Sequence, residues 1–140
     1  MELPEILEMN IYDPFFENKF LLIGSCVPRI YPAVLNDFQN KFQNVCTACL
    51  EKTHYNKIFA KLIDILATGN TKRVAFLTVD GSPHCVQMHF MSKYLKRALK
   101  NDIKYLHYVI TKDREIYSLE IDVIDESKNF AKKGKKFQIN

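Results

Sequence analysis

The distribution of apolar positions along the chain predicts strands and helices in alternation. Two short segments, 19–24 and 73–79, consist mainly of consecutive apolar residues, which is typical of strands that are buried on both faces. Elsewhere apolar residues recur at helical spacing, which predicts helices over about 30–42, 53–68 and 84–100. The first strand is therefore followed by two helices, and the second strand by one.

Two further strands are predicted toward the C-terminus. Residues 103–110 have high β-propensity, and 116–124 alternate between apolar and polar as a half-exposed antiparallel strand does. Residues 112–115 are predicted to form the hairpin turn between them. The order β-α-α-β-α-β-β predicts a single, three-layer-like α/β domain, with a short, mostly parallel sheet, helices on its faces and an antiparallel C-terminal hairpin.

The length of 140 residues indicates one domain. We expect an N-terminal arm over 1–18, an α/β metal-site domain over 19–126 and a basic C-terminal tail over 127–140. The net charge of +4 is modest and much of it comes from this tail, which we expect to be solvated, so a nucleic-acid partner is not expected.

The chain begins with acidic residues, Glu2 and Glu5, rather than with the cationic and apolar regions of a signal peptide. No apolar stretch approaches the roughly 18 residues that a membrane-spanning helix needs. We therefore expect a cytoplasmic protein without membrane contact. In a reducing compartment, cysteines are expected to be ligands, catalysts or core residues rather than disulfide partners.

The four cysteines are the main candidates for chemistry. Cys26 and Cys85 each follow an apolar run that ends in Gly-Ser, and Cys46 and Cys49 form a C-x-x-C pair. Because the carboxyl ends of parallel strands meet at one edge of a sheet, all four are predicted to gather there as metal ligands. The spacing matches no ferredoxin or zinc-finger pattern. Ligands from separate elements favour a [4Fe–4S] iron–sulfur cluster, with zinc as the alternative.

Small residues surround these cysteines and are predicted to leave room for a cofactor and to offer backbone N–H groups to it. They are Gly24, Ser25, Gly81 and Ser82. His84 is predicted to form a hydrogen bond to a ligand sulfur rather than to bind the metal itself. His54 and His89 are alternative ligands for a mixed Cys/His site.

The glycine-rich motifs G-x-G-x-x-G and G-x-x-x-x-G-K-[ST] do not occur in the sequence, so a dinucleotide or P-loop phosphate site is not expected. The function that these patterns favour is electron transfer or redox sensing with a redox partner protein. Two alternatives stay open: a zinc-dependent enzyme with a Cys/His site, and a non-catalytic interaction domain whose cysteines are structural. The patterns point to no particular catalytic residue.

Overall fold

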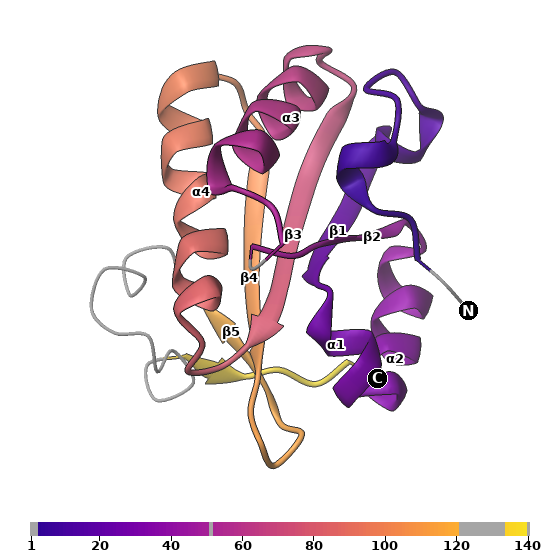
Figure 1. The fold of residues 1–140 in the computed structure, drawn as a ribbon, viewed down its shortest axis with the longest axis vertical. Helices are drawn as coiled ribbons and strands as arrows, with labels where there is room; N and C mark the ends of the chain where they lie inside the picture. Colours follow the sequence, from indigo (N-terminus) through magenta and orange to yellow (C-terminus); the bar gives the residue numbers. More distant parts are fainter. Residues whose placement is uncertain (1–2, 51, 121–133, 140) are drawn as a thin grey trace.

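A six-stranded sheet forms the centre of the computed structural model, which describes residues 3–50, 52–120 and 134–139 (Figure 1). The strands lie in the order β2-β1-β3-β4-β5-β6. Their bounds are β1 Asn18–Gly24, β2 Val45–Ala48, β3 Thr71–Val79, β4 Lys104–Ile110, β5 Ile116–Leu119 and β6 Lys135–Lys136. The helices are α1 Cys26–Ile30, α2 Pro32–Phe42, α3 Tyr55–Ala67 and α4 Pro83–Leu99, preceded by the 3-10 turns Ile6–Glu8 and Pro14–Phe16.

The predicted α/β class is confirmed. Strands β1 to β4 are parallel to one another, whereas β5 is antiparallel to β4 and β6 is antiparallel to β5. No helix in the described ranges is both long and apolar enough to cross a membrane.

Three local predictions differ from the structure. Residues 45–48, where no strand was predicted, form the edge strand β2, in which all four residues are buried. Four residues are too few to show a period, so the apolar pattern did not reveal this strand. The last predicted strand, 116–124, ends at Leu119, and 121–124 lie outside the described residues. Within the predicted tail, the backbone of Lys135–Lys136 pairs with β5, although both side chains are exposed to solvent.

Side chains on the two faces of the sheet build two separate cores. On one face, residues such as Phe20, Leu22 and Phe76 pack against α3 and α4. On the other, Leu21 and Leu77 belong to the core formed with α1 and α2. This division follows from the alternation of side chains along a strand, and Figure 1 shows α3 and α4 running beside each other.

The connection from β1 leads to its neighbour β2, and the connection from β2 leads back past β1 to β3. This reversal of direction along the sheet creates a crevice. The chain passes from β1 to β2 on one side, and then returns across β1 to β3 on the other. A crevice outside the carboxyl ends of the strands at such a point is the usual ligand site of open α/β sheets. The fold therefore places a candidate site beyond the ends of β1, β2 and β3.

Candidate functional site

A cavity of about 310 Å³ lies at this position. Its walls come from the ends of β1, β2 and β3, from the segments that follow these strands, and from α1 and α4. The lining residues include Gly24, Ser25, Cys26, Arg29, Ala48, Cys49, Lys52, Thr78, Val79, Ser82 and Met88. Gly81 shapes the turn at the end of β3, where its φ of +88° favours glycine.

Cys26 and Cys49, two of the four cysteines that were expected to meet as metal ligands, both line the cavity. Gly24 pairs with Ala48, and the backbone N–H of Ser25 donates to the Ala48 carbonyl at 3.1 Å. Cys26 and Cys49 therefore come just after the paired ends of the adjacent strands β1 and β2, although 22 residues separate them in sequence. A Cβ atom on Gly24 would lie 3.6 Å from the Cys26 Sγ, so the missing side chain of Gly24 leaves space beside this thiol.

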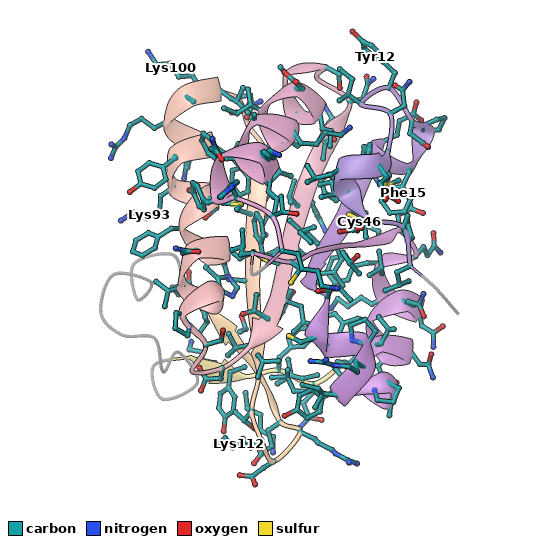
Figure 2. All side chains as sticks on the ribbon, viewed as in Figure 1. Tyr12, Phe15, Cys46, Lys93, Lys100 and Lys112 are labelled. Carbon is teal, nitrogen blue, oxygen red and sulfur yellow. The ribbon has the colours of Figure 1, made fainter. Side chains whose placement is uncertain are left out.

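Cys46 lies in the core and not at the cavity. Its side chain is fully buried on the face covered by α3 and α4, and its thiol donates to the Leu21 carbonyl at 3.7 Å. Figure 2 shows Cys46 in the interior, whereas Lys93, Lys100 and Lys112 reach outward. Burial raises the pKa of the Cys46 thiol far above its ordinary value, which opposes thiolate formation. The C-x-x-C motif thus directs only its second cysteine to the cavity.

The remaining predicted residues are distributed as follows. Cys85 is the third residue of α4, the helix that begins just beyond β3, but the side chains of His84 and Cys85 lie outside the described part. His54 is exposed at the N-terminal boundary of α3. Among the described side chains, no group of three or more His, Cys, Asp or Glu residues is placed to hold a metal ion.

Two cationic residues that the sequence analysis did not single out line the same cavity. Arg29 follows Cys26 by three residues within α1, and Lys52 follows Cys49 by three residues. A separation of three residues on a helix places side chains on one face, a signal that was available for the Cys26–Arg29 pair. Positive charge near a thiol stabilises its thiolate form, and it also attracts anionic ligands.

Behind Thr78, a hydrogen-bonded network extends from the cavity wall into the core. Thr78 Oγ1 lies 2.9 Å from His89 Nε2, and His89 Nδ1 lies 2.8 Å from His107 Nδ1. His107 also stacks on Phe76, with ring centroids 5.4 Å apart. Burial lowers the pKa of His107 to about 4. Burial also lowers the pKa of His89, and the nearby His107 lowers it further.

This network was missed by sequence reasoning because its members come from three elements. His89 lies on α4, His107 on β4 and Thr78 on β3, and no periodic pattern links them. Both ring nitrogens of His89 contact other side chains of the network. His89, an alternative metal ligand in the sequence analysis, therefore faces the core.

Comparisons with known proteins identify the fold family. A family model described as a Rossmann-like domain matches residues 13–138. Searches of curated proteins and of solved structures found no match. The G-x-G-x-x-G fingerprint of dinucleotide binding does not occur in the sequence. Because the match covers nearly the whole chain, the protein belongs to the Rossmann-like domain family.

Proposed function

We propose that the cavity is a metal site in which Cys26 and Cys49 are thiolate ligands. Cys85, placed by its backbone position in the first turn of α4, is the candidate for a third ligand. A [4Fe–4S] cluster is the favoured occupant, and electron transfer or redox sensing with a partner protein in a reducing cytoplasm is the favoured function. The observation that carries this proposal is that two thiols from distant segments line one cavity at the edge of the sheet.

The size of the cavity supports a cluster rather than a single ion. A volume of about 310 Å³ corresponds to roughly ten water molecules. A closed zinc site, in which four protein ligands surround one ion, needs no such space. Gly24 contributes to this room because its bare backbone lies next to the Cys26 sulfur.

The charge around the cavity also supports thiolate ligands. Arg29 and Lys52 line the same cavity as the two cysteines, and a positive charge close to a thiol favours its thiolate form. They would also offset the negative charge that several thiolates bring to a cluster, and such charges set the reduction potential. Cys46 is left out of the proposed ligand set because its buried thiol disfavours ionisation.

Zinc is the alternative occupant of the same thiols. With a water in an open coordination position, zinc would support hydrolytic chemistry. His89 would first have to leave Thr78 and His107 before it could bind a metal. The zinc alternative therefore depends on Cys26 and Cys49 as well.

Metal content after anaerobic purification tests the proposal. Wild-type protein is expected to contain iron and acid-labile sulfide and to absorb broadly in the visible range. Cys26→Ser and Cys49→Ser are expected to lose most of this iron, and Cys46→Ala, the matched control, is expected to retain it. If the wild-type protein is colourless and contains stoichiometric zinc, and if Cys26→Ser and Cys49→Ser lose this zinc, the zinc alternative is supported. Unchanged metal content in the Cys26→Ser/Cys49→Ser double variant, or metal-free protein of undiminished stability, would refute both.

A second candidate function is the binding of a small anion in this cavity. It is favoured by the two cationic side chains, Arg29 and Lys52, at the position where open α/β folds usually bind ligands. Isothermal titration calorimetry with inorganic phosphate tests this candidate. Arg29→Gln and Lys52→Gln are each expected to weaken binding, and the exposed Lys72→Gln on β3 serves as the control. Equal phosphate affinity in all three variants would contradict it.

A further inference from the structure

Three cationic residues, which we call the cationic row, cross the sheet at the amino ends of its strands: Lys19, Arg73 and Lys104. In the register of the sheet, Lys19 of β1 pairs with Arg73 of β3, and Arg73 pairs with Lys104 of β4. Neighbouring strands lie about 4.8 Å apart, so each of three adjacent strands adds one positive charge at this spacing. The cavity lies at the opposite, carboxyl end of the same strands.

The three side chains of the cationic row lie on the same face of the sheet. Side chains alternate along a strand, and the residues two positions further on all belong to the core formed with α1 and α2 or pack against it. These residues are Leu21, Ala75 and Leu106. A direct contact agrees for Lys19, whose Nζ lies 5.9 Å from the centre of the Phe42 ring in α2. The cationic row is therefore on the face that α1 and α2 cover.

Helix α2 is too short to cover the whole length of this face. Its 11 residues span roughly 16 Å, whereas the 9 residues of β3 extend over about 30 Å. The helix ends beside Lys19, whose Nζ donates to the carbonyl of Lys41 in the last turn at 3.2 Å. Figure 1 shows α1 and α2 beside the arrowhead of β3 and not beside its first residues. Arg73 and Lys104 lie past this end of α2 and are exposed.

The positive charge of the cationic row is poorly compensated within the protein. No carboxylate in the described part of the chain forms an ion pair with Arg73 or Lys104. Like charges at neighbouring positions of a sheet are destabilising. Lysines can protect an edge strand against aggregation, but β3 lies in the middle of the sheet, so this explanation does not apply to Arg73.

The three members of the row differ in how much their charge is offset. Two carboxylates, Asp102 and Glu120, line a hollow together with Lys104 and partly offset its charge. Lys19 is held by the last turn of α2, where the helix dipole favours a cation. Arg73 is therefore the least compensated residue of the three.

We propose that the cationic row binds the phosphate backbone of a single-stranded nucleic acid. A guanidinium group binds phosphate oxygens with two parallel hydrogen bonds, and an ammonium group acts as a point charge, so Arg73 flanked by two lysines is suited to successive phosphates. The total charge of the chain did not reveal this surface, because residues far apart in sequence create it. The proposal is independent of the metal and of anion binding in the cavity.

The shape of the surface favours a single strand over a duplex or a membrane. The row lies at the foot of a step formed by the end of α2, which is about one helix diameter, or roughly 10 Å, high. A flexible single strand can follow such a step, whereas a duplex is stiff over a persistence length of about 50 nm. The exposed large apolar side chains of the described residues are Tyr12, Ile30 and Tyr94, and none of them lies on a strand, where it could anchor this face in a membrane.

Fluorescence anisotropy with a labelled poly-uridine oligonucleotide, titrated at several salt concentrations, tests the proposal. The logarithm of the wild-type association constant is expected to fall with the logarithm of the salt concentration with a slope of about −2, since each of three cations contributes about −0.7. Arg73→Gln is expected to weaken binding about fivefold at 0.1 M salt and to reduce the slope by about 0.7. Lys104→Gln is expected to have a smaller effect of the same sign. The matched control is Lys112→Gln, which removes one exposed positive charge beyond the opposite end of β4 (Figure 2) and is expected to keep the wild-type affinity.

Four results would overturn the proposal. The first is no binding of the oligonucleotide even at low salt, and the second is an Arg73→Gln affinity equal to that of the wild type. The third is an equal loss in Lys112→Gln, which would show that only the net charge matters. The fourth is tighter binding of poly-glutamate, of duplex DNA or of vesicles that contain phosphatidylserine, which would assign the row to an acidic protein, a duplex or a membrane.

Thermal unfolding separates a binding role of Arg73 from a structural one. Arg73→Gln removes repulsion between neighbouring positive charges, so its melting temperature is expected to equal or exceed that of the wild type. A clearly lower melting temperature would show that the native fold depends on the Arg73 side chain, and this result would also contradict the proposal. Neither measurement depends on metal content, so failure of this proposal leaves the metal site untouched.

Discussion

Lowering the pH from 7 to 5 perturbs the buried histidine pair, and the structure gives the sign of the effect. Burial lowers the pKa of His107 from 6.5 to about 4, and it lowers the pKa of His89 in the same direction. Between about pH 6.5 and pH 4 the unfolded chain therefore binds more protons than the folded protein. Stability is expected to fall as the pH falls through this window and to recover as it rises.

The magnitude follows from the shift at His107. Inside the window, one such group changes the free energy of unfolding by about 1.4 kcal/mol per pH unit. Starting from a pKa of 6.5 in the unfolded chain and about 4 in the folded protein, His107 alone accounts for a loss of about 2 kcal/mol between pH 7 and pH 5. His89 adds a loss of the same sign.

Urea denaturation at pH 7, 6 and 5 measures this dependence. His107→Gln cannot titrate, so its stability is expected to depend less on pH than that of the wild type. At pH 7 the same variant is expected to be less stable by about 1–3 kcal/mol, because His89 and Ser92 lose a buried partner. The matched control is His54→Gln, at an exposed histidine, which is expected to keep the wild-type pH dependence.

Two results would refute this reasoning. One is a wild-type stability that does not change between pH 7 and pH 5. The other is a His107→Gln variant with the same pH dependence as the wild type, which would assign the effect to groups outside the pair.

Three further predictions concern single positions. Cys46→Ala is expected to lower the free energy of unfolding by about 1–2 kcal/mol, because the variant buries less apolar surface. In the native wild-type protein the Cys46 thiol is expected to resist thiol reagents. Rapid labelling of Cys46 would be inconsistent with its buried location. Gln43 has a φ of +66° in the tight turn after α2, so Gln43→Gly is expected to raise the free energy of unfolding by roughly 0.5–1 kcal/mol, and a lower melting temperature would contradict the strain. A Cβ on Gly134 would lie 2.5 Å from the Ser118 carbonyl oxygen. Gly134→Ala is therefore expected to lower the free energy of unfolding by about 1–3 kcal/mol and to separate β6 from β5. Unchanged amide hydrogen exchange at Lys135 and Lys136 would argue against this.

The sequence determined the fold class because buried strands and amphipathic helices each leave a periodic signal. The apolar runs at 19–24 and 73–79 correspond to β1 and β3, and the helical spacing at 53–68 corresponds to α3. The carboxyl ends of neighbouring parallel strands converge whatever the details of packing. Cys26 and Cys49 line one cavity for this reason.

Only the tertiary structure decided which side chains face the cavity and which face the core. The pairing of a short edge strand with its neighbour decides which of its side chains lie on which face of the sheet. Cys46 pairs with Leu22, and its thiol is therefore buried on the same face of the sheet as the Leu22 side chain. The contact between His89 and His107 required α4 to pack on β4, which no local pattern encodes. Periodicity reports which residues are buried, but the contacts between buried groups depend on the register and packing of separate elements.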